Sequence, residues 1–197
     1  PAMTGSRTGL SGIRVNLVRG DMRAAFVIGF CILFAFIGAF TYVNFVLVRA
    51  PLALTPMSLG LVYLVFAPSL ATTLAAGAVV QRVGSSLALR GGIGIAAAGL
   101  PLTLAPTLPP VLAGLTLVGV GTFFAQAVAS GYVGRNATED RGAASGLYLA
   151  SYFLGGLVGT AVLGIVFEQW GWGACIAGVL TALAIAAFAS RNLRKSS

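Results

Sequence analysis

A segment from Gly142 to Phe167 that carries no charge places the strongest constraint on how this chain folds. As a helix that rises about 1.5 Å per residue, it is long enough to cross a hydrocarbon core of about 30 Å. Small residues recur four apart along it, and such rows let helix backbones approach one another closely in lipid. The glycines expected to pack in this way are Gly155, Gly156, Gly159 and Gly164. The segment therefore predicts a membrane-spanning helix surrounded by other helices.

The composition indicates a membrane protein rather than a soluble domain. Of 197 residues, 58% are hydrophobic and 8% are charged, against roughly 25% charged residues in soluble domains. The net charge of +8 comes from scattered Lys and Arg, not from one basic face, so we expect no nucleic-acid partner. Cys31 and Cys175 lie inside apolar runs, and the sequence has no histidine. We therefore expect no disulfide framework, no metal site and no cofactor.

The apolar runs predict an all-α membrane protein with six transmembrane helices. Polar, basic residues over 1–23 are interpreted as a cytoplasmic linker, and 191–197 as a cytoplasmic tail. Within the bundle at 24–190, the spans are expected at about 24–48, 58–80, 91–108, 111–133, 143–167 and 172–190. Pro68 is expected to kink the second span. Thr138 is expected to cap the fifth, with Glu139 and Asp140 complementing its dipole.

The distribution of basic residues predicts the orientation. One side of the membrane receives nearly all of the twelve Lys and Arg residues: Arg7, Arg14, Arg19, Arg23, Arg82, Arg90, Arg135, Arg141, Arg191, Arg194 and Lys195. The other side receives Arg49. By the positive-inside rule, both termini are then cytoplasmic in a multi-pass protein of the cell (inner) membrane. Trp170 and Trp172 are expected at the outer interface.

Because the chain begins without Met and its basic leader is not a signal peptide, we expect a fragment.

The loop between the second and third spans reads GAVVQRVGSSLALR. It resembles the loop signature of the major facilitator superfamily, in which a glycine precedes a short charged turn (G-x-x-x-D-R-x-G-R). Gly77, Arg82 and Gly84 match this pattern, whereas Gln81 replaces Asp and Ser85 replaces a basic residue. The segments RGAASGLY and WGWGACIAGV are also similar to the family, and FIGAFTYVNFVL suggests its drug and arabinose efflux branch.

The resemblance implies a twelve-helix transporter with two six-helix halves, each an inverted pair of three-helix repeats. This chain is similar to the C-terminal half, which implies an N-terminal six-helix half as its partner. The implied function is secondary active efflux of a small organic solute, such as a drug or sugar, by alternating access. Gly77, Gln81, Arg82 and Gly84 would then form a gating loop at the cytoplasmic side.

In that architecture, the first and fourth helices of each half are the main lining of the central cavity. Asn44 and Gln126 are the only carboxamides inside the expected spans, one on each of these two helices. Polar groups inside a membrane usually face the protein interior or a water-filled cavity. The alternative is that each carboxamide only bonds a neighbouring helix. The expected substrate-binding residues are Phe34, Thr41, Asn44, Phe123, Gln126, Ser130 and Tyr152.

The sequence argues against several other chemistries. No Asp, Glu, Lys, Arg or His lies in the middle of an expected span, so if a coupling proton is used, its carrier lies in the other half. Ser145 has no histidine to activate it, and there is no GxxxxGK[ST] phosphate loop, so we expect no enzyme and no catalytic residue. Two alternatives stay open, namely a self-contained six-span homodimeric carrier and a non-transporting membrane scaffold, because glycine rows fit either.

Overall fold

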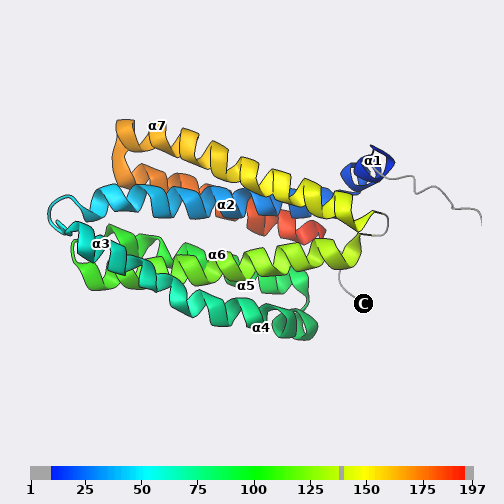
Figure 1. The fold of residues 1–197 in the computed structure, drawn as a ribbon, viewed down its shortest axis with the longest axis horizontal. Coiled ribbons are helices and arrows are strands. Elements are labelled where there is room, and N and C mark those ends of the chain that lie inside the picture. Colours follow the sequence, from blue (N-terminus) through cyan, green and yellow to red (C-terminus); the bar gives the residue numbers. More distant parts are fainter. Residues whose placement is uncertain (1–9, 138–139, 194–197) are drawn as a thin grey trace, which may run out of the picture.

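The described part of the chain is built of helices, since within lipid a helix satisfies its own backbone hydrogen bonds. A computed structural model describes residues 10–137 and 140–193 (Figure 1). The α-helices are α1 (Leu10–Val18), α2 (Gly20–Leu47), α3 (Pro56–Val62), α4 (Ala67–Val83), α5 (Ser85–Gly99), α6 (Leu108–Asn136) and α7 (Arg141–Ala189). Short 3-10 helices follow α3, α5 and α7: η1 (Tyr63–Phe66), η2 (Pro101–Leu104) and η3 (Ser190–Asn192). The all-α prediction is confirmed.

The helix α7 contains two antiparallel segments, because the chain reverses at Gly171. This residue has φ 75° and ψ −169°, a conformation that glycine adopts without steric cost. Among the described residues, five helical stretches are long and apolar enough to cross a membrane, and the last of them, Arg141–Asn192, holds this reversal. Figure 1 shows the second half of α7 returning beside α2. The chain therefore makes six passes along the bundle.

The first transmembrane helix begins inside the segment that we expected to be a linker. Helix α2 starts at Gly20, four residues before the expected span, and α1 precedes it. The charge of Asp21 is accommodated because Arg19 Nη2 lies 2.7 Å from its carboxylate and Tyr132 Oη donates to it over 3.1 Å. A charged first turn can therefore extend a helix beyond its apolar run.

Capping at the start of α7 comes from Asp140, whose carboxylate accepts a hydrogen bond from the Ala143 N–H over 3.0 Å. We had expected Asp140 to act through the helix dipole and Thr138 to provide the cap. Thr138 and Glu139 lie outside the described residues. Asp140 combines both effects, since a carboxylate at the N-cap pairs with a free N–H and also faces the positive end of the dipole.

Proline residues shape the second and third passes. The expected kink at Pro68 occurs as the 3-10 helix η1, which separates α3 from α4 just before this proline. Pro68 has no N–H to donate, so the regular hydrogen-bond ladder cannot run through it. In the third pass, the α-helix ends at Gly99 and Pro101 opens η2. This pass is therefore a shorter α-helix than the expected span over 91–108.

Helix α2 lies against the first half of α7 at nearly backbone contact. A Cβ atom added to Gly155 would overlap the Phe30 carbonyl group, and one added to Gly159 would lie 3.0 Å from Phe34 Cα. Gly156 similarly meets Leu33, and Gly164 meets the Tyr42 hydroxyl, each at 2.8 Å. Gly155 and Gly159 therefore let the two backbones approach each other closely, and Gly156 and Gly164 leave room for the Leu33 and Tyr42 side chains.

A second glycine contact joins the antiparallel helices α5 and α6. A Cβ on Gly99 would lie 2.5 Å from the Gly114 carbonyl oxygen, and a Cβ on Gly92 would lie 3.0 Å from that of Gly121. The two glycines on each helix are seven residues apart, so they share one face. We did not predict this pairing from the sequence.

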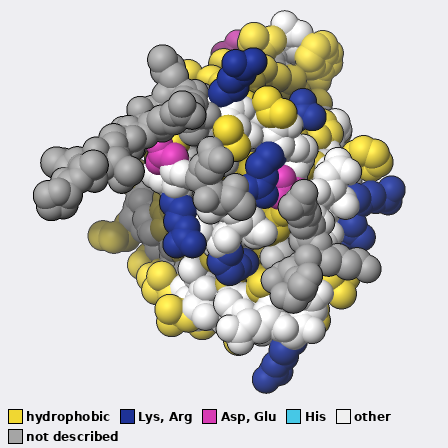
Figure 2. Space-filling model, turned by 90° about the vertical axis from the view of Figure 1, so that its right-hand side faces the viewer, with side chains coloured by type: hydrophobic (Ala, Val, Ile, Leu, Met, Phe, Trp, Pro, Cys, Tyr) yellow, Lys and Arg dark blue, Asp and Glu magenta, His cyan; other side chains and the backbone are white. Residues whose placement is uncertain are grey.

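The basic residues gather at one end of the bundle. In Figure 1 this end carries α1, the connection from α4 to α5, the end of α6 and the start of α7. Figure 2 looks onto it and shows Lys and Arg side chains distributed across the face. Arg49 lies beyond the opposite end of α2, with its guanidinium 5.8 Å from the centre of the Phe167 ring.

The α2–α7 contact predicts which glycine substitutions the fold tolerates. Gly155→Leu and Gly159→Leu should each push the helices apart and lower the free energy of unfolding by about 3 kcal/mol or more, at or beyond the upper range for overpacked sites. Gly146→Leu on the same helix is the matched control, because a Cβ there meets nothing within 4 Å. Unfolding in mixed micelles measures the effect. Equal stability of all three variants would contradict the packing assigned to Gly155 and Gly159.

Candidate functional site

A small pocket lies near the middle of the bundle, between α2, α6 and the first half of α7. Its volume is about 60 Å³. The lining side chains are Ile32, Phe36, Thr122, Phe123, Gln126 and Tyr152. Three of the expected substrate-binding residues, Phe123, Gln126 and Tyr152, therefore come together here from the consecutive helices α6 and α7.

Gln126 is held in this pocket by a tyrosine that we did not include among the expected site residues. Tyr148 Oη donates to Gln126 Oε1 over 2.6 Å, and the Tyr148 ring stacks on Tyr152 with centroids 6.3 Å apart. The tyrosine fits because Gly29 faces it; a Cβ there would lie 2.7 Å from Tyr148 Cε2. Within the described part of the chain, the Gln126 amide nitrogen makes no hydrogen bond, so this residue has a free donor.

Asn44 sits further along α2, where it bonds a tyrosine of η1. Asn44 Nδ2 donates to the Phe40 carbonyl over 2.6 Å and lies 2.9 Å from Tyr63 Oη. The Tyr63 hydroxyl also lies 3.2 Å from Asn44 Oδ1. Both ends of this carboxamide therefore meet protein groups, and the pair ties α2 to η1.

Five aromatic rings connect the Gln126 pocket to the Asn44 pair. Phe66 is central, with ring centroids 4.5 Å from Phe40, 5.7 Å from Phe36, 5.8 Å from Phe123 and 5.9 Å from Tyr63. Phe36 and Phe123 meet edge to face at 5.4 Å. We call Phe36, Phe40, Tyr63, Phe66 and Phe123 the aromatic cluster. It gives the middle of the bundle an apolar, polarizable wall with a carboxamide near each end.

The structure places Phe34 on a different side of α2 from the pocket. Phe34 packs against Gly159 of α7, whereas Phe36 lines the pocket. Residues two apart on a helix do not face each other. Alternating steps of three and four residues from Asn44 predict Phe34 on the pocket side. The side of α2 that meets the pocket instead follows steps of four through Phe40 and Phe36 to Ile32.

Two further expected residues, Ser130 and Thr41, do not line the pocket. Ser130 Oγ donates to the Gln126 carbonyl of its own helix over 2.9 Å. Thr41 is half-buried, and its carbonyl oxygen lies 3.5 Å from Asn44 Nδ2. Tyr148 could have been found from the sequence, because it precedes Tyr152 by one helical turn on the same face.

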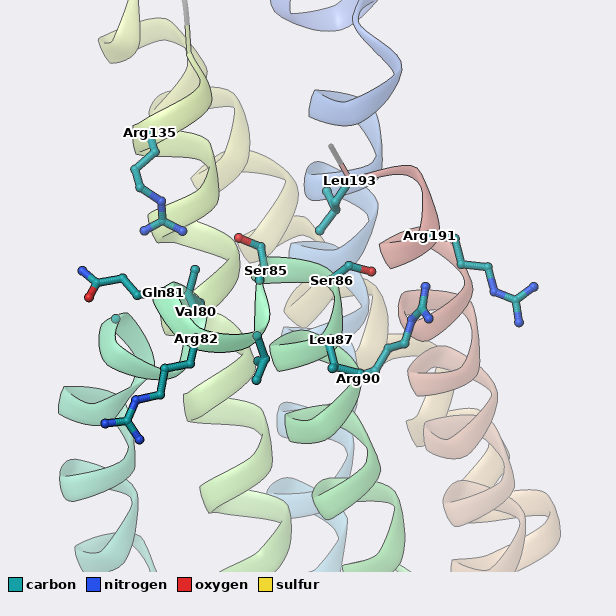
Figure 3. A pocket seen from close by; sticks show the side chains of 13 residues that line it. Val80, Gln81, Arg82, Ser85, Ser86, Leu87, Arg90, Arg135, Arg191 and Leu193 are labelled. Atoms are coloured by element: carbon teal, nitrogen blue, oxygen red, sulfur yellow. The ribbon is translucent and has the colours of Figure 1, made fainter. Parts of the chain in front are cut away.

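A larger cavity, of about 880 Å³, lies at the basic end of the bundle (Figure 3). We call it the basic basin. All four residues of the expected gating loop line it, namely Gly77, Gln81, Arg82 and Gly84. Gly84 has φ 82° and forms the turn between α4 and α5, a backbone conformation that favours glycine.

Four arginines from four helical elements line the basic basin, namely Arg82 of α4, Arg90 of α5, Arg135 of α6 and Arg191 of η3. In Figure 3, Gln81 and Arg82 lie on one side, and Arg90 and Arg191 lie together on the other. Within the described ranges, no three His, Cys, Asp or Glu side chains gather in one place.

Comparison with curated proteins finds bacterial transport proteins among the relatives. The chain is 29% identical over 171 residues to the "Uncharacterized MFS-type transporter YybF" of Bacillus subtilis (strain 168), covering 87% of this chain and 42% of the relative. It is 29% identical over 170 residues to the "Inner membrane transport protein YnfM" of Escherichia coli (strain K12), covering 86% and 41%. An "Uncharacterized transporter" of Buchnera aphidicola subsp. Schizaphis graminum is 24% identical over 186 residues, covering 94% and 45%.

These relatives and the helical fold agree with the resemblance found in the sequence. The chain spans less than half the length of the curated relatives that it matches. Comparison with solved structures finds no match. The family described as "Major Facilitator Superfamily" matches residues 25–196, which is most of the chain. The chain therefore belongs to the Major Facilitator Superfamily.

Proposed function

We propose that this chain is the C-terminal half of a secondary active transporter that exports a small organic solute, such as a drug or sugar, by alternating access. The observation that carries the proposal is the pocket in which Gln126 presents a free amide donor beside Phe123 and Tyr152. A polar group in the middle of a membrane is costly unless it is paired or used. Gln126 is paired through its oxygen, which leaves its nitrogen for a solute.

The chemistry of the pocket favours an uncharged, amphipathic substrate. Its described lining holds four apolar or aromatic side chains, one threonine and one carboxamide, and no charged group. The Thr122 hydroxyl is already engaged, because it donates to the Val118 carbonyl over 2.7 Å. A substrate would therefore bind through ring contacts with the aromatic cluster and a hydrogen bond to Gln126.

The pocket is small because, in this proposal, it is only half of the site. The other half would come from an N-terminal six-helix bundle, and each bundle would be an inverted pair of three-helix repeats. Large apolar side chains are exposed on α3–α4 and the first half of α7, including Leu64, Leu74, Phe153 and Leu157. Exposure of this kind suits contact with a second bundle or with lipid.

Transport would proceed by rocking of the two halves about the central pocket. The gating loop of Gly77, Gln81, Arg82 and Gly84 would open and close the path at the basic end. The positive-inside rule assigns this end to the cytoplasmic side of the inner membrane. A coupling proton, where the transporter uses one, would be carried by the other half. Such a carrier needs no enzymatic step.

Transport assays on the intact protein test the role of Gln126. In inside-out vesicles given a panel of labelled drugs and sugars, the proposed efflux should appear as accumulation. Gln126→Ala should raise the KM of the transported solute about five- to tenfold, since a hydrogen bond contributes about 1 kcal/mol net. Gln169→Ala is the matched control, because Gln169 is an exposed carboxamide in the turn at the other end.

Two results would count against this proposal. An unchanged KM in Gln126→Ala for each transported solute would remove Gln126 from the site. Flux by the 197-residue chain alone would support a self-contained carrier in place of a half.

A double-mutant cycle tests the Asn44–Tyr63 pair. Asn44→Ala and Tyr63→Phe should be non-additive, with a coupling energy of about 0.6 kcal/mol, as is typical for hydrogen bonds between membrane helices. The free energy of unfolding in mixed micelles is the readout. Strict additivity would mean that the pair does not hold η1 against α2. A parallel cycle with Ser130→Ala and Tyr63→Phe provides the additive reference, because Ser130 bonds only its own helix among the described residues.

A further inference from the structure

The basic basin concentrates positive charge without neutralising it. Arg82, Arg90, Arg135 and Arg191 line the basin, and within the described ranges no carboxylate lies within ion-pair distance of any of them. The start of α5 also lines the basin, with Ser85 and Ser86. Backbone N–H groups at a helix start add further partial positive charge. The basin is therefore a place for an anion.

Two of these arginines, Arg90 and Arg191, lie on the same side of the basin (Figure 3), and each is held there by a contact of its own. Arg90 Nε donates to Ser190 Oγ over 3.0 Å, and Ser86 Oγ donates to the Ser190 carbonyl over 2.7 Å. These bonds fasten the start of α5 to the end of α7 and direct Arg90 toward the same side as Arg191 (Figure 3). The Arg191 guanidinium lies 5.2 Å from the centre of the Phe188 ring, which supports its position.

The surface beside this pair is apolar and open. Leu87 is 58% exposed and Phe188 is 65% exposed, and Ile185, about one turn before Phe188 on α7, is 49% exposed. These side chains belong to α5 and the second half of α7, which contribute nothing to the described lining of the central pocket. In Figure 1, both helices lie behind α6 and α2. An exposed apolar stripe on this side is suited to acyl chains.

We propose that Arg90 and Arg191 bind the phosphate of an anionic phospholipid whose acyl chains lie along Leu87, Ile185 and Phe188. Guanidinium groups match phosphate oxygens with two parallel hydrogen bonds each. At the end of α7, the apolar run that contains Ile185 and Phe188 gives way to Ser190 and Arg191. A phospholipid headgroup lies at such a boundary between apolar and charged side chains. Basic pockets between helices on the cytoplasmic side attract anionic lipids by the same chemistry.

A lipid accounts for these features better than a soluble anion does. A free phosphate would use the arginines but leave the exposed Leu87 and Phe188 side chains without a role. The site is also independent of the substrate pocket, because it shares none of the side chains that line the pocket. Its failure would therefore leave the proposed transport function unaffected.

Lipid binding to the intact, purified protein tests the proposal without any variant. Phosphatidylglycerol retained after detergent exchange is titrated and quantified by mass spectrometry, beside phosphatidylcholine, glycerol 3-phosphate and inorganic phosphate as competitors. We expect phosphatidylglycerol to bind at least about tenfold more tightly than phosphatidylcholine, with only weak competition by the two soluble phosphates. Equal binding of both lipids, or displacement of phosphatidylglycerol by equimolar inorganic phosphate, would overturn the proposal.

Substitutions then locate the site. Arg90→Gln combined with Arg191→Gln should weaken phosphatidylglycerol binding about 30-fold, since each basic residue near an anionic lipid contributes roughly a factor of five. Arg14→Gln combined with Arg23→Gln is the control, because it removes two exposed charges at the same end of the bundle. Equal losses in both double variants would overturn the assignment and indicate only a general charge effect.

Single and apolar variants keep the test decisive if the double variant is unstable. Arg191→Gln removes no hydrogen bond within the described residues, and it should weaken binding about fivefold. Leu87→Ser combined with Phe188→Ser should weaken binding of phosphatidylglycerol and leave that of glycerol 3-phosphate unchanged. Unaltered lipid affinity in either variant would contradict the proposed site.

Discussion

The architecture depends on the near contact of the α2 and α7 backbones. In lipid, excluding water cannot drive two apolar helices together, so association relies on close packing. Gly155 and Gly159 provide it, because any side chain there would meet the backbone of Phe30 or Phe34. This contact sets the rotation of α2 about its own axis. The opposite side of α2 then carries Phe36 toward α6, and the central pocket follows from that rotation.

Several polar groups within the bundle join one helix to another. Tyr132 and Arg19 meet Asp21 at the start of α2, and Asn44 meets Tyr63 on η1. Such pairs remove the cost of an unsatisfied polar group in hydrocarbon. Gln126 differs, because Tyr148 satisfies its oxygen while its nitrogen makes no bond in the described part of the chain. That difference separates a candidate binding group from groups whose hydrogen bonds serve the fold.

Uncharged polar side chains and arginine side chains occupy different levels of the bundle. The middle of the bundle presents the aromatic cluster and two carboxamides, and the basic end presents the arginines of the basin. One side of this basin belongs to the end of α4 and to Gly84, and the other belongs to the start of α5 and to η3. A single end of the protein can therefore serve both a moving gate and a lipid contact.

Sequence alone determined the membrane character, the all-α fold and the number of passes, because these follow from run length and charge placement and need no knowledge of neighbours. It also singled out Gln126, Phe123 and Tyr152, since a polar or aromatic residue at a regular spacing is visible in one helix at a time. The choice of Phe36 over Phe34, the partnership of Tyr148 with Gln126 and the pairing of Gly99 with Gly114 were decided by tertiary structure. Each depends on how one helix is rotated against another, and that rotation is set by the whole interface rather than by any local pattern.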